Sequence, residues 1–264
     1  MEDLKVTLVQ TQLQWEDVEK NISMFDGLLN GIKEEPDLIV LPEMFSTGFT
    51  MNTSIAETMN GKSIAWLKEK AKEKNCVITG SLMIRESGKN YNRMIWMQPT
   101  GNFETYDKRH LFRMANEQNH FTAGENKLIV KIKGWNVSPL ICYDLRFPVW
   151  SRNAAASRGG AGWYDLLIYV ANWPARRSLA WNTLVPARAV ENQSYVIAVN
   201  RIGADGYNVD YSGDSSAYNP LGEKLSTIQP NESKHETITL SWKFLQDYRE
   251  KFPAMLDADD FEIK

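Results

Sequence analysis

Short β-rich runs alternate repeatedly with segments of helical periodicity along this chain. Residues 4–10 (LKVTLVQ) alternate as a strand does. The apolar side chains after them recur every three or four residues, as on one face of a helix: Val18, Ile22, Phe25, Leu29 and Ile32. The pattern returns with DLIVLPE at 37–43, a helical segment around 64–71 and CVITGSLMI at 76–84. A strand–helix–strand–helix–strand order is therefore predicted.

The rest of the chain continues this alternation. Turn signals at 99–102 and 134–136 predict two hairpins, the first ending at Lys108 and the second running into Cys142. A helix is expected after Pro148. The later expected elements are strands at 165–170 and 194–200, a helix over about 178–191 between them, and a final helix around 242–251. The pattern favours an α/β fold with helices on both sides of the strands, in a single domain of residues 1–264.

Composition narrows the class of protein. With 264 residues, 43% of them hydrophobic and 24% charged, the chain has the composition of a folded globular protein. A net charge of -3 and short, dispersed basic clusters argue against nucleic acid as a partner. The sequence contains no apolar stretch long enough to span a bilayer, and its first residues do not resemble a secretory leader. We therefore expect a cytoplasmic protein that does not bind membranes.

The chain has two cysteines, Cys76 and Cys142. A chain of this length buries a core without cross-links, so no disulfide framework is implied and a thiol is available for chemistry. Cys76 opens an apolar β run and is expected in the core. The three histidines are scattered, and neither CxxC nor HExxH occurs, so no metal site is predicted.

Three predicted strands end in a chemically capable residue, namely Glu43, Lys108 and Cys142. Functional sites in layered α/β folds collect at the carboxyl ends of strands, which suggests that these residues share a site. The signal is weak by itself, because Glu43 and Lys108 also fit as solvated charges and most free cysteines are buried structural residues.

Longer segments around these residues give a more specific signal. LPEMF (41–45), YDKRHLF (106–112) and SPLICYDLRFP (138–148) resemble, in order and approximate spacing, the three signature segments of the nitrilase superfamily. The resemblance continues through ANWPARR (171–177) and PARAVENQSYVIAVNR (186–201), and it is closest to the omega-amidase branch. It implies a four-layer α-β-β-α sandwich, usually assembled as a homodimer, and an enzyme that needs no cofactor.

The resemblance also implies which residues form the site. The catalytic triad of the superfamily falls on Glu43, Lys108 and Cys142, and its second glutamate falls on Glu117 in MANEQNH. Glu125 lies in the same polar loop and is the alternative for that last position. Since a glutamate already fills the role of base, we interpret His110 as a structural support.

These residue types suit the hydrolysis of an amide. A neutral thiol is a poor nucleophile, so Cys142 needs a base to take its proton. Glu43 can do so, return a proton to the departing ammonia, and later activate the water that cleaves the thioester. Lys108 and the backbone N–H of Tyr143 can hold the oxyanion of the tetrahedral intermediate.

The neighbouring segments suggest supporting roles. Asp144 and Arg146 are expected to form an ion pair that braces the turn carrying Cys142. Residues 173–181 contain two tryptophans and two arginines after a strand: Trp173, Arg176, Arg177 and Trp181. They either line the substrate pocket or form a surface loop with a packed tryptophan. We take Tyr143, Trp173 and Arg176 as candidate substrate-binding residues, because an anionic substrate requires an arginine.

The predicted function is hydrolysis of a small carboxylate-bearing ω-amide to the acid and ammonia. The resemblance to the omega-amidase branch suggests a substrate of the 2-oxoglutaramate or 2-oxosuccinamate type. An N-carbamoyl hydrolase or a nitrilase of the same superfamily would use the same residues and is the first alternative. A non-catalytic scaffold protein with this fold is the second.

Overall fold

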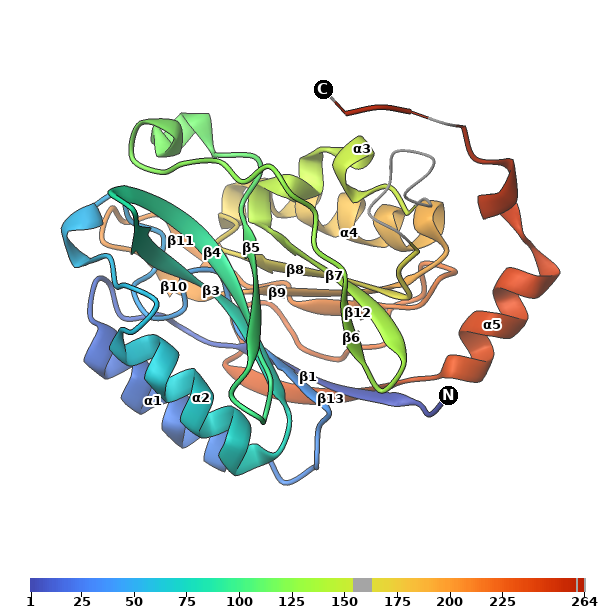
Figure 1. The fold of residues 1–264 in the computed structure, drawn as a ribbon, viewed down its shortest axis with the longest axis horizontal. Coiled ribbons are helices and arrows are strands. Elements are labelled where there is room, and N and C mark those ends of the chain that lie inside the picture. Colours follow the sequence, from blue (N-terminus) through green and yellow to red (C-terminus); the bar gives the residue numbers. More distant parts are fainter. Residues whose placement is uncertain (154–162, 260, 264) are drawn as a thin grey trace.

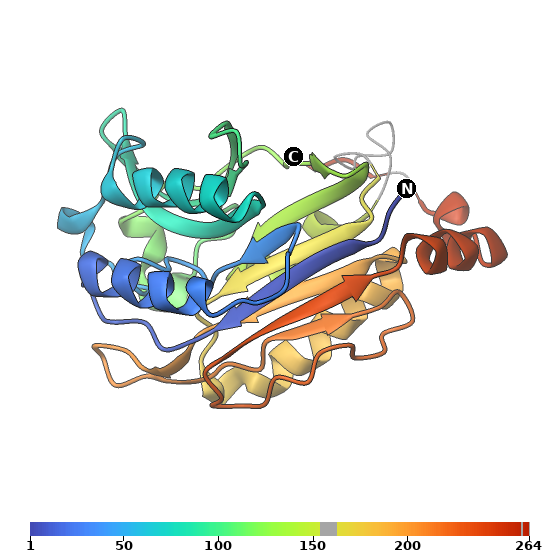
Figure 2. The ribbon, with the colours of Figure 1, turned by 90° about the horizontal axis from the view of Figure 1, so that it is seen from below.

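The computed structural model describes residues 1–153, 163–259 and 261–263. Two large β-sheets pack against each other between two layers of helices (Figures 1 and 2). The predicted four-layer α-β-β-α sandwich is confirmed.

The first sheet carries the strand–helix alternation of the N-terminal half. Its strands lie in the order β13-β1-β2-β3-β4-β5. Their bounds are Leu4–Gln10 (β1), Leu38–Val40 (β2), Val77–Glu86 (β3), Lys89–Met97 (β4), Phe103–Asp107 (β5) and Lys234–Leu240 (β13). β1, β2 and β3 are parallel, as strands joined through helices usually are. The connecting helices α1 (Val18–Asn30) and α2 (Lys62–Lys74) lie side by side on the outer face of this sheet (Figure 2).

Local sequence explains where these helices begin and end. Asp17 caps α1, because its side-chain oxygen accepts a hydrogen bond from the backbone N–H of Lys20. Phe25 and Leu29, on the apolar face of α1, are fully buried against the sheet. α2 ends at Asn75, which adopts the left-handed conformation (φ 50°) that asparagine tolerates. The structure has the order β1, α1, β2, α2, β3 up to this point, so the strand–helix–strand–helix–strand order predicted up to residue 84 is confirmed.

The second sheet has the order β12-β9-β8-β7-β6. Its strands are Val130–Ile132 (β6), Trp135–Ile141 (β7), Leu166–Ala171 (β8), Tyr195–Asn200 (β9) and Ser216–Tyr218 (β12). Helix α4 (Ser178–Asn192) covers its outer face (Figure 2). The helix expected after Pro148 is the short α3 (Pro148–Ser151), and residues 154–162 beyond it lie outside the described part of the chain.

The remaining elements lie at the ends of the sandwich. Strands β10 (Ile202–Ala204) and β11 (Asp210–Ser212) form a small separate hairpin. Helix α5 (Trp242–Lys251), which matches the predicted final helix, lies at the end of the molecule far from α1 and α2 (Figure 1).

Apolar side chains from the two sheets form one core. Val6 and Leu38 of the first sheet belong to the same buried cluster as Val137 and Ile168 of the second, and all four are inaccessible to solvent. Burying an aliphatic side chain of this size stabilises a fold by about 1.5–3 kcal/mol. This packing fixes the two sheets relative to each other, so the segments that follow β2, β5, β7 and β8 meet at one place.

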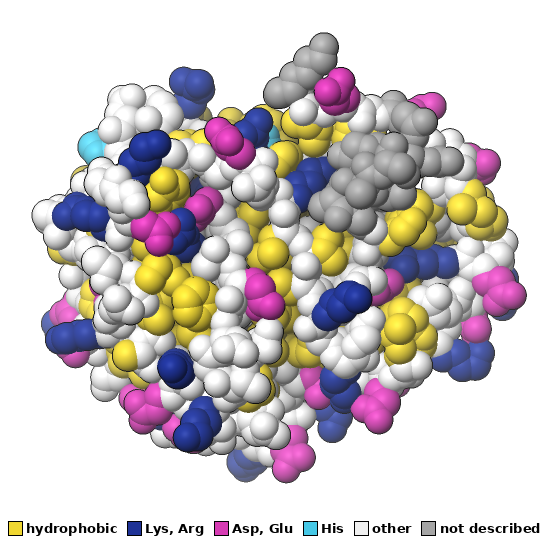
Figure 3. Space-filling view, in the orientation of Figure 1, with side chains coloured by type: hydrophobic (Ala, Val, Ile, Leu, Met, Phe, Trp, Pro, Cys, Tyr) yellow, Lys and Arg dark blue, Asp and Glu magenta, His cyan; other side chains and the backbone are white. Residues whose placement is uncertain are grey.

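Basic, acidic and apolar side chains are interspersed on the face shown in Figure 3, and none of these kinds dominates it. Among the helices of the described residues, none combines the length and apolar content that crossing a bilayer requires.

Candidate active site

A buried cluster of one lysine and two glutamates lies where the strands end. Lys108 Nζ is 2.8 Å from Glu43 Oε1 and 3.0 Å from Glu117 Oε2. None of the three side chains is accessible to solvent. The structure therefore brings together three residues that the sequence placed in separate segments.

Backbone contacts with neighbouring strands hold Glu43 in place. Glu43 follows β2, and the N–H of Leu41 donates to Thr79 O of β3 (2.7 Å). Met44, directly after the glutamate, adopts a left-handed conformation (φ 43°), and its N–H donates to Ser81 Oγ (2.9 Å). This unusual backbone turns the chain just beyond β2 and keeps the carboxylate inside the sandwich.

Lys108 reaches the cluster because it directly follows β5. Its backbone N–H donates to the carbonyl of Asn92 on the neighbouring strand β4 (2.9 Å). Burial opposes the charged form of the Lys108 ammonium, but the carboxylates of Glu117 and Glu43 outweigh burial and raise its pKa above the ordinary value. Lys108 therefore remains a fixed positive charge.

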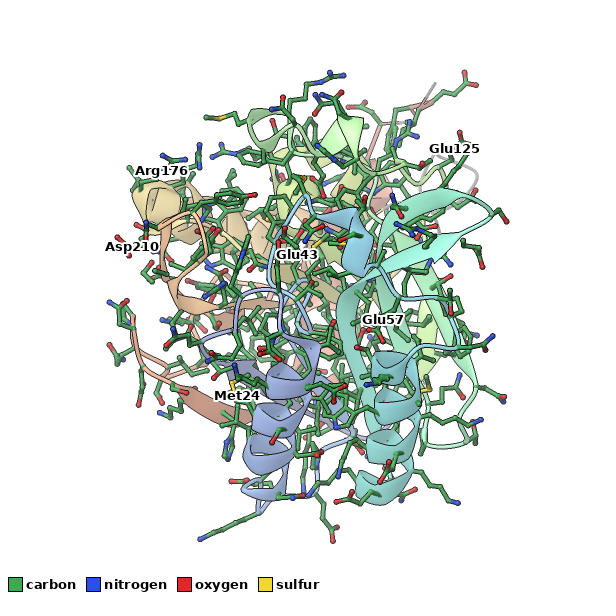
Figure 4. The ribbon with its side chains drawn as sticks, turned by 90° about the vertical axis from the view of Figure 1, so that its left-hand side faces the viewer. Met24, Glu43, Glu57, Glu125, Arg176 and Asp210 are labelled. Carbon is green, nitrogen blue, oxygen red and sulfur yellow. The ribbon has the colours of Figure 1, made fainter. Side chains whose placement is uncertain are left out.

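Glu117, rather than Glu125, is the second glutamate of the cluster. It opens a short 3₁₀ helix (Glu117–Asn119), and the N–H of Phe112 donates to its Oε2. Burial raises the pKa of Glu117, although the Lys108 ammonium lowers it. Glu125 is exposed and lies well away from Glu43 (Figure 4).

Sequence reasoning missed Asn92, which joins the two glutamates. Its Nδ2 donates to Glu43 Oε1 (2.7 Å) and to Glu117 Oε1 (3.3 Å), and its Oδ1 accepts from Ser81 Oγ (2.8 Å). The signal was its position in β4, where it shares the buried face with Met94 and Trp96. A polar residue on an apolar strand face indicates a buried polar contact.

Asn172, the second missed residue, binds Glu43 from the other sheet. Its backbone N–H donates to Glu43 Oε2 (2.7 Å), and its Nδ2 donates to Glu43 O (2.6 Å). Asn172 directly follows β8, so the strand-end argument used for Glu43, Lys108 and Cys142 would have found it. Each oxygen of the Glu43 carboxylate thus accepts at least one hydrogen bond.

Cys142 is the first residue after β7 and opens the 3₁₀ helix Cys142–Arg146. It has a left-handed backbone (φ 45°), a conformation that costs a non-glycine residue energy and that often occurs at functional sites. Cys142 as a whole is 8% exposed to solvent. Burial and then the negative charge of Glu43 raise the pKa of the thiol well above its ordinary value, although Lys108 lowers it. Burial therefore favours the neutral form of the thiol.

Cys142 and Lys108 line a cavity of about 270 Å³. The predicted substrate-binding residues Tyr143, Trp173 and Arg176 line it as well. Arg176 is exposed and lies at the edge of the molecule, whereas Glu43 lies inside it (Figure 4).

Two further arginines, Arg146 and Arg177, line the same cavity. The Arg177 guanidinium lies over the ring of Phe112 (5.3 Å), and its Nη2 contacts the sulfur of Met114 (3.2 Å). Its buried Nη1 has no hydrogen-bond partner among the described residues. Burial and the neighbouring arginines lower the pKa of Arg177. Arg177 thus brings a positive charge to the cavity wall, and one of its buried donors is unpaired among the described residues.

The predicted ion pair between Asp144 and Arg146 is wrong. Asp144 is fully buried beneath the turn and accepts hydrogen bonds from Tyr106, His110 and Ile141. Arg146 is exposed on the cavity side, where its guanidinium lies 4.9 Å from the ring centre of Trp173. The two side chains leave a short 3₁₀ helix in different directions, one into the protein and one into the cavity.

The structure also shows where Trp181, His110 and Cys76 lie. Trp181 does not line the cavity with Trp173; it is fully buried behind it, with ring centres 5.4 Å apart. His110 contacts Asp144, as expected for a structural support. Cys76 is 2% exposed in the core, as predicted, and burial raises its pKa to about 12. Among the described residues, no group of three His, Cys, Asp or Glu side chains is arranged to hold a metal ion.

Comparison with known proteins identifies the family of this chain. The model of the carbon-nitrogen hydrolase family matches residues 5–250. The chain is 46% identical over 263 residues to omega-amidase YafV of Escherichia coli (strain K12), covering 100% of both. It is 31% identical to 2-oxoglutaramate amidase of Bacillus subtilis (strain 168), covering 84% of this chain and 85% of that protein.

A solved structure is similar over the full length. XC1258 from Xanthomonas campestris, a CN-hydrolase superfamily protein with an arsenic adduct in its active site, has a TM-score of 0.96 and 41% identity, with 100% of both chains covered. The fold and the family match are those of a hydrolase that acts on carbon–nitrogen bonds other than peptide bonds. The chain belongs to the carbon-nitrogen hydrolase family of the nitrilase superfamily, in its omega-amidase-like branch, and is an amidase.

Proposed function

We propose that the protein hydrolyses a small ω-amide whose other end carries a carboxylate, of the 2-oxoglutaramate or 2-oxosuccinamate type. The observation that carries this proposal is that one cavity holds both Cys142 and Arg177, whose Nη1 has no partner among the described residues. The omega-amidase and 2-oxoglutaramate amidase relatives support the same substrate class.

In the first half of the reaction, Cys142 Sγ attacks the amide carbon and Glu43 accepts the thiol proton. Proton transfer accompanies the attack because the resting thiol is neutral. The Lys108 ammonium and the backbone N–H of Tyr143 stabilise the oxyanion. Glu43 then donates its proton to the amide nitrogen, the C–N bond breaks, and ammonia leaves a thioester on Cys142.

In the second half, Glu43 takes a proton from water as the water oxygen attacks the thioester carbon. The C–S bond breaks, the acid is released, and the Cys142 sulfur recovers its proton from Glu43. Glu117 does not exchange protons in this scheme. Its carboxylate holds the Lys108 ammonium in position through two contacts of 3.0 and 3.1 Å. No cofactor takes part.

The arginines give the cavity its preference for an anionic substrate. Asp205 is the acidic residue among those that line the cavity, but its carboxylate accepts hydrogen bonds within its own loop, from the N–H of Tyr207 and Val209 and from the hydroxyl of Tyr211. It therefore does not pair with the arginines. We assign the substrate carboxylate to Arg177, with the exposed Arg176 contributing longer-range attraction.

Ammonia release tests the reaction and the nucleophile together. The substrates are 2-oxoglutaramate, succinamate, glutamine, an aliphatic nitrile and an N-carbamoyl amino acid, each with the wild type and with Cys142→Ala. We expect turnover of the dicarboxylate monoamides and none by the variant. Preferential turnover of the nitrile or the carbamoyl compound would reassign the substrate within the superfamily. Full activity of Cys142→Ala would refute the thioester.

A matched pair of variants tests carboxylate recognition. Arg177→Gln is expected to raise KM for 2-oxoglutaramate at least about 10-fold, because a charge-assisted hydrogen bond is lost. Arg176→Gln should raise it by less. A neutral amide of similar size, glutaramide, should be hydrolysed equally by both variants. Equal losses on the charged and neutral amides would contradict the assignment.

The homodimer and the cytoplasmic location stay predictions. Light scattering, which measures the mass of the particle in solution, tests the homodimer.

A further inference from the structure

The carboxylate of Asp144 links the two segments that carry Lys108 and Cys142. Its Oδ1 accepts from the backbone N–H of His110 (3.0 Å) and contacts His110 Nδ1 (2.8 Å). Its Oδ2 accepts from the hydroxyl of Tyr106 (2.7 Å) and from the N–H of Ile141 (3.0 Å). One buried side chain therefore binds both segments.

The positions of these donors in the sequence matter. Tyr106 and His110 lie on either side of Lys108, and Ile141 directly precedes Cys142. Through these donors Asp144 ties the segment that carries Lys108 to the segment that carries Cys142. Cys142 also has a left-handed backbone, which persists only where the surroundings hold it in place.

The His110 ring is held in a defined orientation. It stacks on Phe147 with ring centres 3.6 Å apart and an interplanar angle of 5°. A carboxylate oxygen only accepts hydrogen bonds, so the ring nitrogen Nδ1 is the donor to Asp144. Unlike the fully buried Asp144, the His110 side chain is 22% exposed. It can therefore be substituted at lower risk to folding than Asp144.

His110 does not contact the space where a substrate would bind. It lines two other cavities, both together with Phe147, and it is absent from the lining of the cavity that holds Cys142 and Lys108. A direct role as acid or base in the reaction is therefore excluded by its position.

We infer that His110 is a positioning residue. Through its Nδ1–H it orients the Asp144 carboxylate, and Asp144 in turn holds the Cys142 turn against the Lys108 segment. This inference rests on the proposed function, because it takes Cys142 as the nucleophile. It concerns kcat rather than substrate binding, since the contacts to the substrate carboxylate lie elsewhere in the cavity.

Three substitutions distinguish positioning from mere structural support. His110→Asn places an amide N–H where Nδ1 stands, whereas His110→Gln places it where Nε2 stands and His110→Ala removes it. We expect kcat to fall about 10–100-fold in the Gln and Ala variants, because small misplacements of reacting groups cost this much. His110→Asn should stay within about 3-fold of the wild type, and KM should change less than about 3-fold throughout.

Alkylation of Cys142 by iodoacetamide, followed by mass spectrometry, gives a readout that needs no substrate. Its rate should fall in the Gln and Ala variants and be restored in the Asn variant. His120→Ala, at an exposed histidine in the same region, is the matched control and should match the wild type in both assays. Circular dichroism melts identify a variant that has simply lost stability.

Two results would overturn the inference. One is wild-type kcat and alkylation in His110→Ala, and the other is equal behaviour of the Asn and Gln variants. Failure of the proposed function is a separate result, because it appears as activity in Cys142→Ala whatever the His110 variants do.

Discussion

Lys108 Nζ donates to Glu43 Oε1 across 2.8 Å, and neither side chain is accessible to solvent. A buried ion pair of this kind is sensitive to the loss of either partner, since the remaining charge stays buried without compensation; removing one partner typically costs about 3–5 kcal/mol. Substitutions that preserve shape are therefore needed to separate effects on catalysis from effects on folding.

Glu43→Gln is expected to lower kcat by about 10²–10⁴-fold, the usual contribution of a positioned general base. The amide keeps the shape of the side chain but cannot accept the thiol proton, and its NH2 group replaces one of the two accepting oxygens. Ammonia release and a denaturation curve are measured on the same sample. Glu125→Gln, at the exposed glutamate, is the control and should retain full activity. A Glu43→Gln variant with wild-type kcat would exclude Glu43 as the base.

Lys108→Met leaves Glu43 and Glu117 buried together without a cation. We expect it to lower the free energy of unfolding by about 3–5 kcal/mol. Adding Glu117→Gln to this variant removes one of the two repelling charges, so the double variant should be more stable than Lys108→Met alone. Urea unfolding of the wild type, both single variants and the double variant measures this coupling. If the double variant lost as much stability as the two single variants together, this coupling between Lys108 and Glu117 would be contradicted.

The two thiols should differ in accessibility although burial raises the pKa of both. Cys142 lines a cavity beside Glu43, whereas Cys76 lies in the core, so we expect iodoacetamide to alkylate Cys142 at least about 10-fold faster at neutral pH. Because the pKa of Cys142 lies well above its ordinary value of 9.0, its rate should rise continuously between pH 6 and 9. Peptide mass spectrometry over a time course measures both rates. A plateau in this range would show that the thiol is ionised at lower pH.

Lys127 gives a pH-dependent prediction for stability. Burial lowers its pKa from the ordinary 10.5 to about 8, and its Nζ has no hydrogen-bond partner among the described residues. The amine lies over the ring of Trp150 (5.2 Å). Between pH 8 and 10.5 the lysine binds a proton in the unfolded chain but not in the folded chain, so the destabilising contribution of Lys127 falls as the pH rises.

Lys127→Met removes this dependence. At pH 7 it should stabilise the protein by about 1 kcal/mol, a figure reduced for solvent screening because the residue is partly exposed. The gain should disappear as the pH approaches 10.5. Thermal melts at pH 7, 8.5 and 10 measure it, with the exposed Lys131→Met as control. A gain that is constant across this range would point to packing rather than to the charge of Lys127.

Local sequence determined most of the elements and the residue types of the site. Periodicity over a few residues depends on which face of a strand or helix is buried, so it predicted α1, α2, α4 and α5 close to their observed bounds. Glu43, Lys108 and Cys142 were found because each lies at the end of a predicted strand. The signature segments around them supplied the family and Glu117, while the catalytic roles of all four remain predictions.

Tertiary structure alone decided the contacts between segments far apart in the chain. It showed that Asn92 and Asn172 bind Glu43 from two different sheets. It also directed Asp144 to His110 instead of Arg146, and it buried one guanidinium donor of Arg177 without a hydrogen-bond partner among the described residues. No local pattern encodes these choices, because each depends on how the two sheets pack and on which direction a side chain takes from its turn.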